Sequence, residues 1–101
     1  MQLNYRVRYT KSAKRDLLRL YQFLLERDVE SARNALESIN KSIDLLQSFP
    51  FTCRKASPDN PFLREMVISF GGGGYVALFE IEDDINVTIL AVRHQREEDY
   101  Y

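Results

Sequence analysis

The chain has 101 residues, is 45% hydrophobic and carries a formal net charge of −1, which is typical of one soluble globular domain spanning residues 1–101. A domain of this size builds a single modest core, which excludes a large enclosed active site, so we expect function on a face or in a shallow cleft. With one cysteine, no signal peptide and no apolar run long enough to cross a bilayer, the sequence excludes an internal disulfide and predicts a cytoplasmic protein without membrane contact.

The small net charge hides an asymmetry between the two halves of the chain. Residues 1–55 hold eleven Lys/Arg and six Asp/Glu, whereas residues 56–101 hold three and nine. The basic excess is densest in YRVRYTKSAKRDLLR, residues 5–19. Such a block attracts nucleic acid, an acidic partner or the ribosome, or else it is a solvated helix face, and the composition leaves these alternatives open.

The first half of the chain predicts a strand followed by two helices. Residues 4–10, NYRVRYT, alternate apolar and basic side chains, as a half-buried strand does. Apolar residues at helical spacing predict helices from about 12 to 27 and from about 29 to 48, and the very short link between them favours an antiparallel hairpin. Pro50 ends the second helix, and residues 51–62 are rich in turn formers and predict a loop.

The second half of the chain predicts three strands, over residues 63–70, 75–81 and 85–92. The segments GGGG and EDD join them with links of hairpin length, so we expect an antiparallel meander. A strand, a helical hairpin and then a meander predict an α+β fold in which the hairpin packs on one face of a small twisted sheet. We expect the N-terminal strand to join this sheet, beside a neighbour that the pattern does not identify.

The late strands carry two arginines and the single histidine of the chain. Arg64 opens the first strand of the meander, and Arg93 and His94 end the last one. Strict strand alternation places Arg93 in line with Ile89 and Val87, and His94 on the opposite face.

These cations are candidates for binding a polyanion. Arg54 and Lys55 precede Arg64 in the predicted loop, so the three residues and Arg93 are expected to gather near the sheet. Arginine binds phosphate through a bidentate fork and keeps its charge at any relevant pH. Ion pairs between these arginines and nearby glutamates are the structural alternative. GGGG lacks the Gly-Lys-Ser/Thr of a phosphate loop, and one histidine without cysteine partners argues against a transition metal, so we expect neither a metal nor a cofactor.

Three segments of the chain resemble RelE/ParE-superfamily toxins of bacterial type II toxin–antitoxin systems. They are the helical hairpin KSAKRDLLRLYQFL…ESARNALESINKSIDLL, the segment FLREMVISFGGGGYVALFEI and the closing VTILAVRHQREEDYY. The resemblance covers nearly the whole chain and implies the same α+β fold. It also implies a growth-inhibiting toxin that forms a hetero-oligomer with a cognate antitoxin, whose disordered segment wraps the toxin. Leu18, Phe23 and Leu25 are the candidates for contact with the antitoxin.

The resemblance implies one of two activities. ParE-like members poison DNA gyrase without doing chemistry themselves, whereas RelE-like members cut mRNA on the ribosome and need an acid, a base and cations around the phosphate. The low net charge and the weakly basic loop favour the ParE-like branch. The candidate target-binding residues are then Arg54, Lys55, Arg64, Arg93, His94 and Arg96. In the ribonuclease alternative the catalytic candidates are Arg64, Arg93, His94 and Tyr100, and an inactive member that only binds antitoxin is the third possibility.

Overall fold

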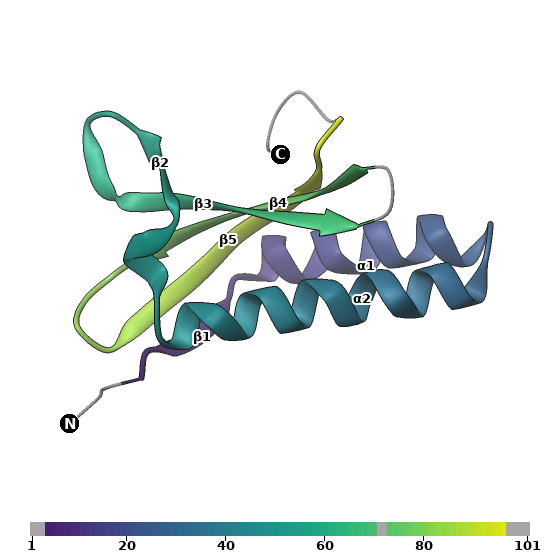
Figure 1. Cartoon of the computed structure of the whole chain (residues 1–101), viewed down its shortest axis with the longest axis horizontal. Coiled ribbons are helices and arrows are strands. Elements are labelled where there is room, and N and C mark those ends of the chain that lie inside the picture. The colour runs from purple at the N-terminus through teal and green to yellow at the C-terminus, as the bar shows by residue number, and fades with distance from the viewer. Residues whose placement is uncertain (1–3, 71–72, 97–101) are drawn as a thin grey trace.

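The computed structural model describes residues 4–70 and 73–96, and within them the helices and strands follow the predicted order (Figure 1). The elements are β1 (Arg6–Tyr9), α1 (Lys11–Leu25), α2 (Val29–Asp44), the short 3₁₀ helices η1 (Leu45–Gln47) and η2 (Pro50–Thr52), β2 (Arg54–Ser57), β3 (Asn60–Phe70), β4 (Gly73–Ile81) and β5 (Asn86–His94). The α+β class is confirmed.

The strands form one five-stranded sheet in the order β1-β5-β4-β3-β2. The meander β3, β4 and β5 pairs antiparallel as predicted. The neighbour of β1, which the sequence left open, is β5, and the two strands run parallel with Arg6 beside Asn86 and Tyr9 beside Ile89. Parallel pairing needs a long crossover connection, and the helical hairpin with the first strands of the meander supplies it.

The loop predicted over residues 51–62 is wrong in part. This segment contains the last two residues of η2, the whole of β2 and the first residues of β3, and Ser57 pairs with Asn60 across a tight turn. Turn formers indicate a change of chain direction, but here that change is a short hairpin within the sheet rather than an extended loop. The second helix also ends earlier than predicted, at Asp44, and continues as the 3₁₀ helix η1.

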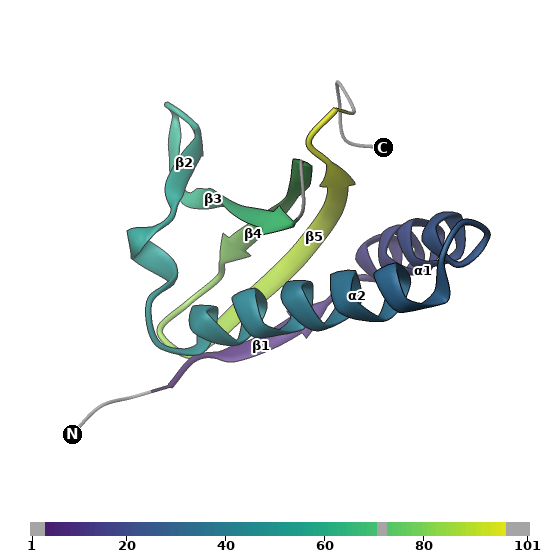
Figure 2. The same cartoon turned by 45° about the vertical axis from the view of Figure 1, so that its right-hand side comes forward.

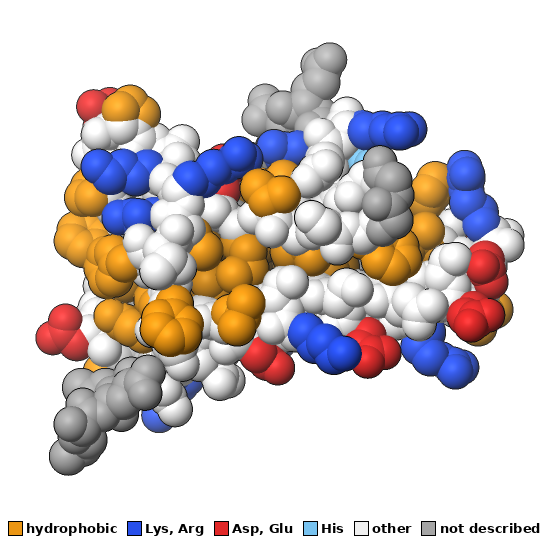
Figure 3. Space-filling view, in the orientation of Figure 1, with side chains coloured by type: hydrophobic (Ala, Val, Ile, Leu, Met, Phe, Trp, Pro, Cys, Tyr) orange, Lys and Arg blue, Asp and Glu red, His pale blue; other side chains and the backbone are white. Residues whose placement is uncertain are grey.

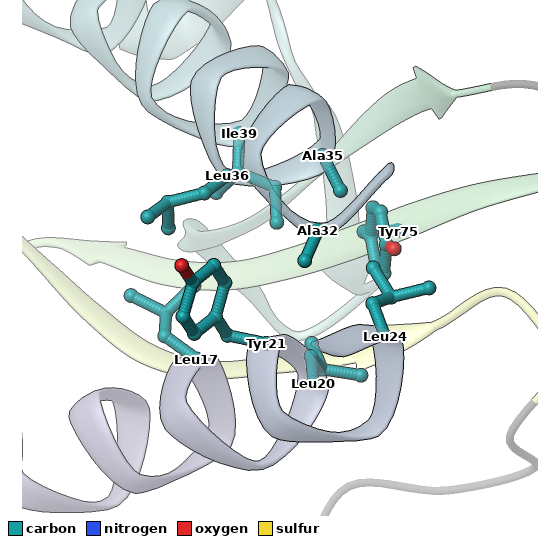
Figure 4. Close-up of a pocket in the computed structure, with 9 residues that line it drawn as sticks. All are labelled: Leu17, Leu20, Tyr21, Leu24, Ala32, Ala35, Leu36, Ile39 and Tyr75. Atoms are coloured by element: carbon teal, nitrogen blue, oxygen red, sulfur yellow. The ribbon is translucent and has the colours of Figure 1, made fainter. Parts of the chain in front are cut away.

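Both helices cover the same face of the sheet, as Figure 2 shows. Helix α1 packs on β5 and α2 packs on β3. Alanines on α2 let the helices approach closely, and the space left between them is only about 10 Å³, too small for a ligand. Figure 4 shows the residues that meet there: Leu17, Leu20, Tyr21 and Leu24 of α1, Ala32, Ala35, Leu36 and Ile39 of α2, and Tyr75 of β4.

The described part of the chain contains no helix with the length and apolarity needed to cross a bilayer.

A β-bulge in β5 overturns the predicted alternation of that strand. Leu78 pairs with Ala91 and Phe79 pairs with Ile89, so Leu90 is an extra residue on β5. An extra residue reverses which face the following side chains occupy. Arg93 therefore does not share a face with Ile89 and Val87, and it lies on the open face of the sheet, away from the helices. His94 shares the helix-covered face with the buried Val92, Ile89 and Val87.

The first turns of α1 take over the hydrogen bonding of β5 beyond this bulge. Strand β1 ends at Tyr9, so within residues 4–70 and 73–96 no strand pairs with this edge of β5 after Ile89. The Thr10 hydroxyl, which also caps α1, donates to the carbonyl oxygen of Leu90 at 3.2 Å. The backbone N–H of Val92 donates to Oδ2 of Asp16 at 2.9 Å. The helix thereby fixes the bulged end of the strand.

Candidate functional site

A groove of about 740 Å³ opens between α1 and the end of the sheet where β3, β4 and β5 approach the helix hairpin. Its lining combines positive charges with aromatic rings. The lining residues are Arg19, Leu20, Phe23, Leu24 and Arg27 from the α1 side, and Phe70, Tyr75, His94 and Arg96 from the sheet side. We refer to these nine residues as the arginine groove.

The helix side of the groove is a stripe of alternating charge and ring. Arg19 and Phe23 lie one helical turn apart on α1, and Arg27 follows four residues after Phe23, in the turn beyond the last helical residue, Leu25. The Arg27 guanidinium lies 4.4 Å from the centre of the Phe23 ring, within cation–π range. Phe23 is nonetheless 53% exposed, which is unusual for a ring of this size. The stripe therefore presents an apolar surface between two positive charges.

The sheet side of the groove is built from three neighbouring rings, those of Phe70, Tyr75 and His94. Tyr75 meets the edge of the His94 ring at 5.6 Å between centres and lies 6.2 Å from Phe70. Burial raises the pKa of the Tyr75 phenol, so this group stays protonated at neutral pH. The backbone N–H of Arg96 donates to Nδ1 of His94 at 3.1 Å, and this bond holds the chain so that Arg96 lines the groove.

The groove unites residues that the sequence assigned to different partners. His94 and Arg96, predicted to bind the target, lie beside Phe23, predicted to contact the antitoxin. Leu18 is 55% exposed on α1 but does not line the groove, and Leu25 is half-buried. Tyr100 lies outside the described residues.

Arg64 and Arg93 do not gather as predicted, because they lie on opposite faces of the sheet. Arg93 is half-buried on the open face, and its Nη1 donates to the carbonyl oxygens of His94 and Gln95 at 3.3 and 3.4 Å. Arg64 lies on the helix-covered face, because it pairs with the core residue Phe79. The predicted phosphate-binding pair is therefore not assembled.

Arg64 instead braces the chain around η2. Its Nε donates to the carbonyl oxygen of Pro61 at 2.6 Å, and its Nη1 donates to those of Phe51 and Cys53 at 3.1 and 2.8 Å. Backbone carbonyls that turn away from a sheet need such partners. The guanidinium thus satisfies three of them at once and ties η2 to the start of β3.

The remaining predicted cations lie on the edge strand β2, where Figure 3 shows a group of basic side chains. Arg54 pairs with Glu65 on β3, with 3.1 Å between Nε and Oε1, so part of its charge is neutralised. Lys55 pairs with Arg64 in the register and therefore lies on the other face from Arg54. Charged side chains on an edge strand also discourage unwanted strand pairing.

The catalytic candidates that the structure describes, Arg64, Arg93 and His94, do not converge on one point. Arg64 and His94 share a face, but their partners on β4, Phe79 and Tyr75, are four residues apart, about 14 Å along a strand. Within residues 4–70 and 73–96, no cluster of three or more His, Cys, Asp or Glu offers a metal site. The arginine groove, by contrast, fits a polypeptide segment with apolar and acidic side chains.

Sequence reasoning missed six residues of the groove, namely Arg19, Leu20, Leu24, Arg27, Phe70 and Tyr75. The four-residue spacing of Arg19, Phe23 and Arg27 is a sequence pattern from which the α1 side of the groove could have been predicted. No comparable pattern marked Phe70 and Tyr75, because their approach to α1 depends on how the hairpin crosses the sheet.

Comparisons with known proteins give a consistent result. Residues 7–99 match the model of the family described as the ParE toxin of the type II toxin–antitoxin system parDE. The chain is 33% identical over 85 residues to the toxin RelE3 of Caulobacter vibrioides, which covers 84% of this chain and 88% of that protein. It also resembles a solved chain of the chromosomal ParDE system from P. aeruginosa with a TM-score of 0.70, at 19% identity, covering 89% of this chain and 95% of that one. The last likeness shows a shared fold.

Proposed function

The chain belongs to the ParE toxin family of type II toxin–antitoxin systems, and from that premise we propose that it is a ParE-like inhibitor of DNA gyrase that acts in the cytoplasm and is neutralised by a cognate antitoxin. In this proposal the toxin inhibits by binding and stalling its target, and it catalyses no reaction. It forms a hetero-oligomer with the antitoxin when it is held inactive.

We favour gyrase inhibition over mRNA cleavage because of where Arg64, Arg93 and His94 lie. Cleavage of RNA needs an acid, a base and cations around one phosphate. Arg93 lies on the open face, Arg64 braces backbone carbonyls and His94 lies on the helix-covered face with Nδ1 already accepting a hydrogen bond. Such a dispersed set supports inhibition by binding over ribonuclease chemistry.

The arginine groove supports the antitoxin part of the proposal. Its three arginines favour a segment that carries Asp or Glu, and the exposed Phe23 ring favours an apolar side chain from the same segment. A disordered segment that folds on binding suits a groove that is open along its length. Leu18 and Leu25 extend this proposed contact along α1.

The alternative is a ribosome-dependent mRNA endonuclease, and it is favoured by the name of the relative RelE3. In that case Arg93 or His94 takes part in cleavage, so Arg93→Ala or His94→Ala would abolish it. Both activities predict that expression without antitoxin stops growth, whereas an inactive member would leave growth unchanged.

The proposal is tested by giving the purified protein two substrates in parallel. With gyrase, ATP and relaxed plasmid, we expect supercoiling to be lost. In a translating extract we expect full-length mRNA to persist at the same protein concentration. Cleaved mRNA together with unimpaired supercoiling would contradict the proposal and favour the endonuclease.

A further inference from the structure

A second hollow, of about 240 Å³, lies at the opposite end of the sheet from the arginine groove. Tyr75 of β4 lines the groove and Ile81 of β4 lines this hollow, six positions away, which is about 20 Å along a strand. We call it the acidic pocket. Its lining residues are Tyr5, Phe51, Phe62, Ile81, Glu82, Asp83 and Asp84.

The apolar part of the acidic pocket is formed by two aromatic rings that are unusually exposed. Phe51 is 48% and Phe62 is 49% exposed, and the rings meet edge to face at 6.2 Å. Figure 3 shows hydrophobic side chains gathering at this end of the molecule, around η2, β2 and the start of β3. Contiguous exposed apolar surface on a small domain marks an interaction site more often than chance exposure.

The rings are held in place rather than left loose. The Arg64 guanidinium lies 5.4 Å from the centre of the Phe51 ring, and the same side chain donates to the carbonyl oxygens of Phe51 and Pro61, the latter next to Phe62. A surface that is already ordered loses less conformational entropy when a partner binds. Because Arg64 holds the segments that carry both rings, a partner that binds here would meet a surface that is already ordered.

The rim of the acidic pocket is negative. Oδ1 of Asp83 accepts the backbone N–H groups of Ile85 and Asn86 at 2.8 and 2.7 Å, which lowers the pKa of that carboxyl and keeps it ionised. Glu82 pairs with Arg8 at 3.0 Å, whereas Asp84 is exposed at the tip of the β4–β5 turn. The pocket thus combines an apolar floor with a surplus of negative charge at its edge, opposite in sign to the arginine groove.

We infer that the acidic pocket docks the target protein, and that it receives an apolar side chain flanked by Lys or Arg. The inference rests on the proposed function, in which the target is DNA gyrase, because an enzyme that handles DNA presents surfaces rich in Lys and Arg. A second copy of this chain is a poorer occupant, because a two-fold contact through the pocket would bring two sets of acidic residues together. The antitoxin segment that suits the arginine groove carries the wrong charge for this pocket.

The test uses two variants with exposed side chains, Phe62→Ser and Asp84→Lys, and compares them with the unmodified full-length protein. Matched controls lie away from the pocket on α2: Val29→Ser removes an equally exposed apolar side chain, and Glu37→Lys reverses an exposed charge. For each protein we measure half-maximal inhibition of gyrase supercoiling, affinity for the antitoxin and melting temperature. The melting temperature checks that each variant is folded.

We expect the two pocket variants to inhibit gyrase about tenfold more weakly or worse, as for loss of an interface hot spot, with antitoxin affinity unchanged. The controls should match the unmodified protein. Pocket variants that inhibit gyrase normally overturn the inference, and so do variants that lose antitoxin affinity instead. If the unmodified protein does not inhibit gyrase, the proposed function is wrong. The same assay therefore distinguishes this result from failure of the pocket inference, in which the unmodified protein and the pocket variants inhibit gyrase equally.

Discussion

Oδ2 of Asp16 on α1 accepts a hydrogen bond from the backbone N–H of Val92 on β5 at 2.9 Å, 76 positions later in the chain. The bond lies beyond the point where β1 ends, so a side chain of the helix pairs with the edge of β5 where β1 no longer does. Together with the bond from Thr10 to Leu90, it fixes the bulged end of β5. That end of the strand directs His94 to the arginine groove.

Removing the Asp16 carboxylate should destabilise the protein. In Asp16→Ala the Val92 N–H, which is part of a largely buried strand, loses its acceptor, and we expect the free energy of unfolding to fall by about 1–3 kcal/mol. Asp16→Asn keeps an acceptor oxygen and should lose less. Urea denaturation followed by circular dichroism measures both, with the exposed Glu37→Ala as the control expected to stay within about 0.5 kcal/mol of the unmodified protein. Equal stability of Asp16→Ala and the control would refute the role of this bond.

Arg64 should behave as a structural residue and not as a ligand for phosphate. Arg64→Met leaves the carbonyl oxygens of Phe51, Cys53 and Pro61 without this donor, so we expect a loss of about 1–3 kcal/mol in the free energy of unfolding. Arg64→Lys should restore little of it, because an ammonium lacks the planar fork that reaches three carbonyls. Thermal unfolding is the measurement. A variant that keeps full stability while losing activity would return Arg64 to the role first predicted for it.

The arginine groove should control affinity for the antitoxin. Arg27→Glu reverses a charge beside the exposed Phe23 ring, and Phe23→Ser removes the ring itself. Each change should weaken antitoxin binding about tenfold or more, since buried aromatic and arginine side chains dominate interface energies. Calorimetry with the purified antitoxin measures the affinity, and Lys41→Glu on the outer face of α2 is the charge-matched control. Unchanged affinity in both groove variants would place the antitoxin elsewhere.

Two capping aspartates should make stability fall on the acid side of neutrality. The Ser31 hydroxyl and then the Glu30 backbone N–H lower the pKa of Asp28, and the backbone N–H of Ile85 and the side chain of Asn86 lower that of Asp83, both from an ordinary value of 3.8. A carboxyl whose pKa is lower in the folded state stabilises the fold above its unfolded pKa, and this stabilisation is lost as the pH falls through the folded value.

This prediction is tested by measuring, across a range of pH, the melting temperatures of the unmodified protein and of the double variant Asp28→Asn/Asp83→Asn. We expect the unmodified protein to be the more stable at pH about 7 and the difference to shrink below pH about 4, as both carboxyls are protonated. A difference that is constant across this range would show that ionisation of these two residues does not contribute.

Sequence patterns predicted the elements well where periodicity was long and failed where one residue changed a register. The stripes of α1 and α2 and the hairpin links gave the α+β fold and the meander. The extra residue Leu90 leaves no mark in an apolar run such as INVTILAV, so the faces of Arg93 and Val87 were assigned wrongly relative to each other. The faces of the residues after Leu90 depend on tertiary contacts, in this case those between α1 and the edge of β5.

The candidate site was predicted only in fragments for a related reason. His94, Arg96 and Phe23 were each selected, but their meeting in one groove depends on the angle at which the hairpin crosses the sheet. Arg64 was selected for its charge, yet its donors are directed at backbone carbonyls that no sequence pattern reveals.

The most direct test of the central claim is whether the antitoxin-free protein traps gyrase on cleaved DNA. Purified gyrase, ATP and relaxed plasmid are incubated with the protein, and the products are separated after denaturation of the enzyme. The account predicts lost supercoiling and accumulation of linear DNA, both prevented when the antitoxin is added first. Normal supercoiling with no linear DNA, at protein concentrations that stop growth in cells, would contradict it.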